Sequence, residues 1–507
     1  MNAPSTRLRP LALKPLPPWR PENDAHLPRL ARRMHGLSGG VGADLRSLLE
    51  HEPAELAADE LSALPAGYVY FAQFVAHDVS LQPVDGFECG PSSPRTFELD
   101  LDSLYGAGPL AHPHLYDRGD PRRIALVRGV GEGVYAQFDL MRSSSGLACI
   151  EDARNDQNVL VSQVHVAVAR AHNALVGACE RLPELVGHGP YSVFRAARLL
   201  TTWLYQWVVA ADWLPRILHP ALAQRLAGGV AAYDTCIFKE EPARLTTEFC
   251  FAAGRFGHAL VRPKYRLNAW VPPLPIVPWG EQPPHAHLMA QHPLHRDWFL
   301  DLRMFLDLSA PQTARVEQLR GPLLAALAVD KSDQVQRARR LKPRFTRRMA
   351  LMPVPPGASQ DLRLMALRSL AAGVAAGLPS GSDLAKALDL PQEFDPGQPL
   401  LISVLQEAER VHAGERLGEF GSRLVGDTLL GALQIDGASI AHNPDFHPSS
   451  FSAQGEPFDL AELLLLGDGD PAALAAWMQR CGFTAPLARQ LSAWSASTRK
   501  ESRPPSV

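Results

Sequence analysis

The stretch 71-FAQFVAHDVSLQ-82 decides the interpretation of this sequence, because three polar side chains interrupt what is otherwise the pattern of a buried helix. Gln73 and His77 are four residues apart, so they share one face of such a helix. Asp78 follows directly and points in another direction. Burying polar groups without partners is costly, so we expect other segments of the chain to supply partners for all three.

The composition excludes several classes of protein. The chain has 507 residues and a formal net charge of -3, which suffices for a large core and argues against a nucleic-acid-binding protein. Its six cysteines form no CxxC pair, so we expect neither a disulfide scaffold nor a zinc site of cysteine spacing. The most apolar stretch, 199–215, is short for a membrane span and contains Gln206 and Asp212. Residues 1–23 lack the apolar core of a signal peptide, so we expect a cytoplasmic protein without a membrane span.

Helical periodicity dominates the chain, and few segments alternate as strands do. Apolar residues recur at three- and four-residue spacing over 159–185, 192–218, 312–330, 361–377, 399–413 and 417–435. We therefore predict a mainly α fold, with one large domain over 26–495 that has long irregular loops and few short strands. An extended arm over 1–25 precedes this domain, and a disordered tail over 496–507 follows it. The basic segment 336–349 is interpreted as a solvated face or a strand edge.

The segment 95-RTFELDLDSLYG-106 alternates acidic and apolar residues, as a half-buried strand does. Asp is disfavoured in strands, and carboxylates on one side repel one another. Two readings remain open from the spacing alone. The segment is either an acidic surface strand or a calcium loop, because Ca²⁺ takes six to eight oxygen ligands from carboxylates, hydroxyls and carbonyls.

Two further segments carry isolated polar residues in apolar surroundings. Arg154 stands in the loop ahead of the helix 159–185, where it either caps loop carbonyls or directs its fixed charge at an anionic group. His258 follows Gly257 in 255-RFGHAL-260. It is either a hydrogen-bonded core histidine or a haem ligand beside an apolar wall.

Read together, these segments resemble the animal-type haem peroxidases of the peroxidase–cyclooxygenase superfamily, and bacterial members in particular. The four motifs follow in the family order: QxxxHD at 73–78, TxxxDxD at 96–102 ending in YG, the arginine loop with RxHN at 170–173, and RFGH at 255–258. The likeness covers about residues 65–430. It implies the large, single-domain, mainly helical haem peroxidase fold, with haem b and Ca²⁺ as cofactors.

The resemblance also implies a role for each residue singled out above. His77 is the distal catalytic histidine, Gln73 lines the same pocket, and Arg154 is the distal catalytic arginine. His258 is the proximal ligand of the haem iron, and Arg255 pairs with a haem propionate. The implied calcium ligands are Asp78, Thr96, the carbonyl of Glu98, Asp100 and Asp102. Calcium therefore becomes the favoured reading of the acidic segment.

The activity implied by the resemblance is the reduction of hydrogen peroxide through a ferryl intermediate, followed by oxidation of a small organic or halide donor. Three positions depart from the family pattern. Ala76 and Gln157 replace the two carboxylates that form ester links to haem in many mammalian members, so noncovalent haem is expected. Ser369 stands where the family has an asparagine beside the proximal histidine, unless the register differs there.

Two alternatives of another class are weighed against the peroxidase. A fatty-acid dioxygenase or cyclooxygenase of this superfamily uses a radical-forming tyrosine three residues before the proximal histidine, and that position is Arg255. A non-catalytic haem-binding relic is disfavoured because Gln73, His77, Arg154 and His258 are all present.

Overall fold

The structure, a computed structural model, describes residues 11–37, 56–80, 96–128, 138–189, 191–238, 242–280, 282–320, 335–354, 357–453 and 455–501. The first part of the predicted arm, 1–10, and the last part of the predicted tail, 502–507, lie outside these ranges. Within the described arm, Leu11 forms a bridge with Thr246 and the Trp19 amide donates to the carbonyl of Leu378.

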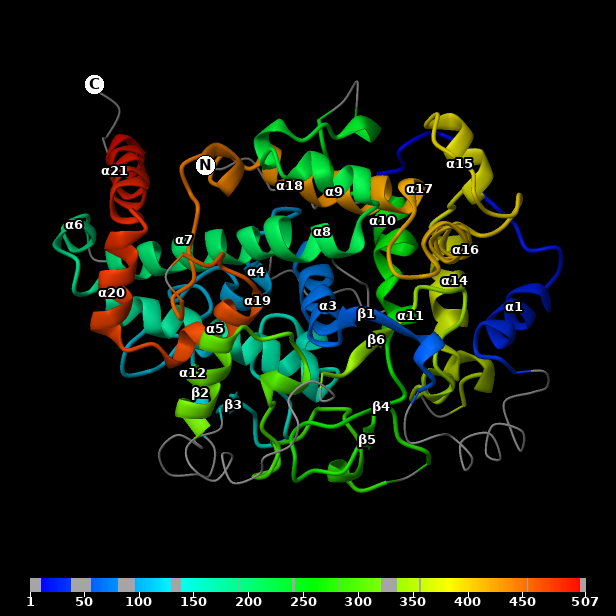
Figure 1. Cartoon of the computed structure of the whole chain (residues 1–507), viewed down its shortest axis with the longest axis horizontal. Coiled ribbons are helices and arrows are strands. Elements are labelled where there is room, and N and C mark those ends of the chain that lie inside the picture. Colours follow the sequence, from blue (N-terminus) through cyan, green and yellow to red (C-terminus); the bar gives the residue numbers. More distant parts are fainter. Residues whose placement is uncertain are drawn as a thin grey trace.

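Two long helices cross the centre of the molecule side by side, α5 (Val159–Cys179) and α7 (Ser192–Trp207) (Figure 1). Most residues of α5 are buried on every side of the helix, which is the pattern of a helix inside a core. The helix begins at Asn158, whose side-chain oxygen accepts a hydrogen bond from the amide of Val161 at 2.9 Å. The helical prediction over 159–185 is therefore confirmed, with α6 (Pro183–Val186) completing it.

The helix α7 continues through a π-helical segment, η5 (Val208–Trp213), into α8 (Leu214–Ile217). The two polar residues of this apolar stretch are satisfied inside the protein. Asp212 accepts from the Tyr68 hydroxyl at 2.7 Å, and Gln206 donates to the carbonyl of Leu99 at 3.0 Å. Among the described residues, no helix has the length and apolar character that crossing a membrane requires.

The helix α3 (Gly67–Val79) contains Gln73, His77 and Asp78 and lies near the centre of the molecule (Figure 1). It follows β1 (Leu61–Pro65), which pairs antiparallel with β6 (Arg337–Arg339). The Gly67 amide donates to the carbonyl of Phe305 at 2.8 Å. A side chain on Gly67 would meet that oxygen at 2.7 Å, so only glycine lets α3 begin so close to this loop.

The other helices and strands surround this centre, and several of them form the flanks visible in Figure 1. Two more strand pairs are short: β2 (Leu126–Arg128) with β3 (Phe138–Leu140), and β4 (Lys264–Tyr265) with β5 (Leu274–Pro275). The remaining helices are α1 (His26–Met34), α4 (Asp102–Tyr105), α9 (Pro220–Leu226), α10 (Thr247–Phe251), α11 (Gly257–Leu260), α12 (Ala310–Arg320), α14 (Met365–Ala375), α15 (Gly381–Ala387), α16 (Leu400–His412), α17 (Glu419–Ser422), the π-helical η13 (Arg423–Asp427), α18 (Thr428–Ile435), α19 (Leu460–Leu465), α20 (Pro471–Arg480) and α21 (Thr484–Glu501). This mainly helical architecture confirms the predicted fold class.

Three local expectations need correction. The acidic segment forms no strand: residues 97–100 are a series of bends, and Leu101 has a left-handed φ of 60°. Its apolar residues Phe97 and Leu99 are nevertheless buried. The helix α21 runs to Glu501, so it extends into the predicted tail. The basic segment does include the strand β6, but Arg339 and Arg348 are buried rather than solvated.

Candidate active site

The helix α3 and the arginine loop meet through a hydrogen bond between His77 and Asn155. The loop contains a short 3-10 helix, η4 (Ala153–Asp156), and Asn155 is fully buried in it. The Asn155 Oδ1 lies 2.9 Å from Nδ1 of His77. On the other side of the amide, Nδ2 of Asn155 lies 3.2 Å from Nδ1 of His165 in α5. One amide therefore connects two buried histidines.

The direction of these hydrogen bonds follows from the chemistry of the three groups. Burial lowers the pKa of His165 to about 4, so its ring is neutral at physiological pH. A neutral Nδ1 that faces an amide NH₂ acts as the acceptor, which leaves Oδ1 of Asn155 to accept from the Nδ1–H of His77. The basic lone pair of His77 is then on Nε2.

Arg154 ties the loop to the end of α3. Its guanidinium forms an ion pair with Asp152 at 2.7 Å, and Nη2 donates to the carbonyl of His77 at 2.9 Å and to that of Ser80. The Nη1 group makes only a 3.4 Å contact with Oγ of Ser80. Arg154 thus caps carbonyls at the C-terminal end of α3 rather than carbonyls of its own loop, and Nη1 is its least engaged nitrogen.

Gln73 joins the same network one turn before His77. Its Nε2 donates to Oε1 of Gln157 at 3.2 Å, and its Oε1 accepts from Nδ2 of Asn158 at 3.1 Å. The prediction that Gln73 and His77 share a helix face is confirmed, since both face residues of the arginine loop. Gln157 and Asn158 thus supply neutral amides beside this face.

His258 lies on α11, which packs against α3. Its Nδ1 is 3.2 Å from Oγ of Ser369 on α14, and that hydroxyl donates to the carbonyl of Met365 at 3.0 Å. The hydroxyl oxygen therefore accepts from the Nδ1–H of His258, and the lone pair of the ring is on Nε2. The register that pairs Ser369 with the proximal histidine is consistent with this contact.

Electrostatics keep His258 neutral. Burial, followed by the charges of Arg255 and His77, lowers its pKa to about 3. By accessible surface the ring is half-buried.

Arg255 is a half-buried cation three residues before His258. Its Nε donates to the carbonyl of Cys250 at 3.1 Å, and no carboxylate forms an ion pair with it in the part of the chain that the structure describes. Burial lowers its pKa, and the neighbouring charge of Arg154 acts in the same direction. Because an uncompensated buried charge is costly, this position is suited to an anionic ligand group.

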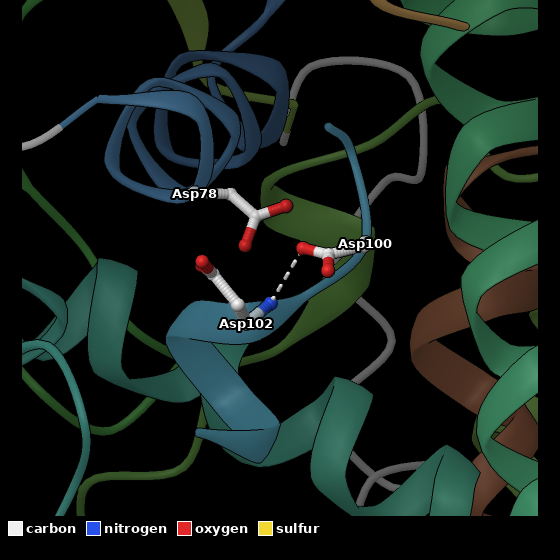
Figure 2. A group of neighbouring side chains, drawn as sticks. All are labelled: Asp78, Asp100 and Asp102. Atoms are coloured by element: carbon white, nitrogen blue, oxygen red, sulfur yellow. Dashed lines mark hydrogen bonds between the residues drawn. The ribbon is translucent and has the colours of Figure 1, made fainter. Parts of the chain in front are cut away.

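A second cluster lies behind the other face of α3, where Asp78, Asp100 and Asp102 bring their carboxylates together (Figure 2). One oxygen from each lies within 4.8 Å of the others. Asp78 is fully buried and accepts from the amide of Leu101 at 3.1 Å and from the hydroxyl of Ser103 at 2.8 Å. The amide of Asp102 donates to Asp100 at 3.1 Å, as the dashed line in Figure 2 shows.

The structure thus brings together three of the predicted calcium residues, Asp78, Asp100 and Asp102, with Thr96 beside them. The Thr96 amide donates to Asp102 at 2.9 Å, and the Thr96 hydroxyl lies beside the carboxylate of Asp100. The Glu98 carboxylate is not part of the three-aspartate group, and burial together with nearby carboxylates raises its pKa to about 7. Converging carboxylates beside a hydroxyl are a donor set that suits a hard cation.

Comparison with known proteins identifies the class. A family model described as animal haem peroxidase matches residues 135–292. Thyroid peroxidase from Canis lupus familiaris is 24% identical over 283 residues, which are 48% of this chain and 29% of the relative. Thyroid peroxidase from Homo sapiens is 32% identical over 116 residues, and a peroxidase-like protein from Margaritifera margaritifera is 32% identical over 118 residues. These matches cover 12% and 14% of those relatives, so this chain spans less than a third of each of the three.

Among solved structures, peroxidase A from Dictyostelium discoideum is similar over 86% of this chain and 88% of its own, with a TM-score of 0.53 and 15% identity. This likeness defines the fold as the mainly helical peroxidase fold. The family-model match, the peroxidase relatives and the shared fold together support an animal-type haem peroxidase, a family that implies haem as cofactor.

The residues present fit a haem group. The neutral Nε2 lone pair of His258 makes no hydrogen bond to any described residue and suits a haem iron. Arg255 supplies the buried cation that a propionate would neutralise. The contact between Asn155 and His77 is the functional feature that the sequence pattern did not reveal, because a loop asparagine beside an arginine gives no periodic signal.

The acidic cluster yields a prediction about the metal-free protein. Burial raises the pKa of Asp100, and Arg198 only partly opposes this, so the ionised carboxylate destabilises the folded state at neutral pH. We expect Asp100→Asn to raise the thermal unfolding midpoint of chelator-treated protein by a few degrees at pH 7.5. The gain should vanish as the pH falls through the raised pKa, because the wild-type carboxyl is then neutral.

A matched control is Asp395→Asn, which removes an exposed aspartate whose pKa is lowered by its hydrogen bond to Arg410. This variant should be neutral or slightly destabilising. A lower unfolding midpoint for Asp100→Asn in chelator would contradict the electrostatic description of the cluster.

Proposed function

We propose that this chain is a haem-dependent peroxidase that reduces hydrogen peroxide and oxidises a small organic or halide donor. In this proposal His77, Arg154 and Gln73 act on the distal side, and His258 holds the haem iron from the proximal side. The observation that carries the proposal is the pair of oriented histidines, His77 and His258. Each is fixed through Nδ1, His77 by Asn155 and His258 by Ser369, and each therefore has its lone pair on Nε2.

Haem bound here would supply the iron at which the peroxide O–O bond is cleaved and the two oxidising equivalents are held. The protein's part in that step is proton transfer. Nε2 of His77 accepts the proton from one peroxide oxygen and delivers it to the other, which leaves as water. The hydrogen bond from Nδ1–H to Asn155 keeps the ring in the tautomer that this transfer needs.

Arg154 and Gln73 support the transfer in different ways. Arg154 directs Nη1, its least engaged nitrogen, at the charge that develops as the O–O bond breaks. Its remaining nitrogens hold the loop to α3 and so fix the distance between His77 and Asn155. Gln73, held by Gln157 and Asn158, offers neutral polar groups beside the substrate.

Arg255 would pair with a haem propionate, and Ser369 would orient the proximal ring. Asp78, Asp100, Asp102 and Thr96, with the carbonyl of Glu98, would hold Ca²⁺. Since His77 and Asp78 are consecutive on α3, a cation bound by Asp78 would hold the distal histidine in place.

The test of this function separates the contribution of the base, His77, from that of Asn155, which positions it. We expect His77→Leu, loaded with haem, to react with hydrogen peroxide about 10²–10⁴-fold more slowly than wild type in stopped-flow spectroscopy, since a positioned acid–base group contributes that much. The reaction of Asn155→Leu with hydrogen peroxide should be about 10–100-fold slower than that of wild type, as is typical when an outer hydrogen-bond partner is removed.

Asn155→Asp distinguishes positioning from structural damage. The aspartate still accepts from Nδ1–H of His77, but its negative charge favours the protonated ring. The acidic limb of the pH–rate profile should therefore move to higher pH, while the rate at high pH is largely retained. Wild-type rates in His77→Leu would refute the assignment of the base.

The mode of haem attachment is a separate prediction. Ala76 carries no carboxyl group, and Gln157 is an amide engaged with Gln73, so neither position can form an ester with haem. Acid–acetone should therefore extract all of the haem from the precipitated protein after several peroxide turnovers. Haem that stays with the protein pellet would contradict noncovalent binding.

The calcium proposal predicts that Ca²⁺ reverses the sign of the difference in unfolding midpoint between Asp100→Asn and wild type. A cation that binds only the folded state adds about 2.7 kcal/mol at a hundred-fold excess over its dissociation constant. We expect Ca²⁺ to raise the unfolding midpoint of wild type and to leave Asp100→Asn almost unchanged. The variant should thus be more stable than wild type in chelator and less stable in Ca²⁺; an equal response to Ca²⁺ in both proteins would exclude this site.

A further inference from the structure

A buried histidine without a role in the proposed mechanism lies beside the candidate active site. His165 is on α5, with 2% of its surface exposed, and its Nδ1 is 3.2 Å from Nδ2 of Asn155. The ring packs edge-to-face with Phe74 of α3, with centroids 6.0 Å apart and ring planes at 82°. These two contacts restrict the rotation of the ring, so the packing fixes which of its nitrogens faces Asn155.

The side-chain amide of Asn155 couples His165 to His77. It is fully buried, and its hydrogen bonds within the described part of the chain are the one to His77 at 2.9 Å and the one to His165. A primary amide has an oxygen that only accepts and a nitrogen that only donates. One of the two rings must therefore present an N–H at Nδ1, and the other must present a lone pair there. This opposition holds for both orientations of the amide.

His165 stays within this coupling at neutral pH because it does not take up a second proton. Burial lowers its pKa to about 4, so the ring carries a single N–H. With that hydrogen on Nε2, the lone pair at Nδ1 accepts from the NH₂ group of Asn155. If the hydrogen moved to Nδ1, the amide would have to turn, and its NH₂ group would face His77. The hydrogen of His77 would then be on Nε2, and the ring would lose the basic nitrogen that faces the substrate.

We propose that His165 is a positioning residue that selects the tautomer of His77 through Asn155. Its Nδ1 lone pair holds the NH₂ group of the amide, so the amide oxygen faces His77 and keeps the hydrogen of that ring on Nδ1. Nε2 of His77 is thereby left as the basic nitrogen. The consequence for catalysis rests on the proposed function, whereas the coupling of the two tautomers is a property of the chain alone.

His172 offers a matched control on the same helix. It follows His165 by about two turns, is fully buried, and has a pKa that burial also lowers to about 4. Its Nδ1 lies 3.0 Å from the Tyr105 hydroxyl, and its Nε2 lies 2.9 Å from the carbonyl of Arg122. Replacing His172 therefore removes an equally buried imidazole from α5 without changing a hydrogen bond of Asn155.

The test is nuclear magnetic resonance of the haem-free full chain with ¹⁵N-labelled histidine, because the ¹⁵N shift of a ring nitrogen reports whether it carries hydrogen. The signals of His77 and His165 are assigned by their loss in His77→Leu and in His165→Phe. We expect wild type to carry the hydrogen of His77 on Nδ1 and that of His165 on Nε2. In His165→Phe, which keeps a flat ring against Phe74 but has no acceptor, His77 should lose its single tautomer and show a mixture of both. In His172→Phe, His77 should keep the wild-type tautomer.

Asn155→Asp serves as the second variant if His165→Phe does not fold, which circular dichroism reports. An ionised carboxylate accepts from both rings, so the coupling predicts a change at His165 rather than at His77. The hydrogen of His165 should move from Nε2 to Nδ1, while His77 keeps its Nδ1 hydrogen. An unchanged tautomer of His165 in this variant would count against the coupling.

Wild type with a hydrogen at Nδ1 of both rings, or of neither, would overturn the proposal, and so would an unchanged His77 tautomer in His165→Phe. An equal change in His172→Phe would also overturn it, because the effect would then come from general damage to α5. The measurement needs neither haem nor peroxide, so it is separate from the test of the peroxidase. If His77 changes tautomer in His165→Phe while the haem-loaded variant reacts with hydrogen peroxide at the wild-type rate, the coupling is supported and the role of His77 as the base is contradicted.

Discussion

The constraint on which the site depends is the rotation of about 100° between successive residues of a helix. His77 and Asp78 are neighbours on α3, so their side chains leave the helix toward different regions. His77 meets Asn155 of the arginine loop, and Asp78 receives hydrogen bonds from Leu101 and Ser103 of the acidic segment. One short helix therefore fixes the position of a basic nitrogen relative to a carboxylate cluster, and disturbing either partner moves the other.

Amides and hydroxyls rather than charges fix the two histidines of the site. Asn155 holds His77, and Ser369 holds His258. A carboxylate in either place would favour the protonated ring and strengthen its nitrogen as a donor of electron density. With neutral partners both rings keep the properties of ordinary neutral imidazoles. Charge enters through Arg154 and Arg255, which raise the electrostatic potential of the region between the histidines and suit it to an anionic cofactor edge.

Periodicity made the framework predictable from the sequence, whereas the contacts between loops were not predictable. The helices α5, α7, α14 and α16 follow from apolar spacing, because burial on a helix face imposes that spacing. The shared helix face of Gln73 and His77 follows from their four-residue separation on α3. The contacts of Asn155 join an irregular loop to two helices, and an irregular loop has no repeat to read. The burial of Arg339 was likewise hidden, since it results from strand pairing with β1.

The central proposal is that His258 would ligate the iron of a bound haem, and an optical spectrum tests it most directly. Haem-supplemented wild type should give a ferric Soret band typical of histidine ligation, which shifts on addition of one equivalent of hydrogen peroxide. His258→Ala should lose that ligation, and added imidazole should restore the ferric band by occupying the position of the missing ring. Identical spectra of wild type and His258→Ala, with and without imidazole, would contradict the account.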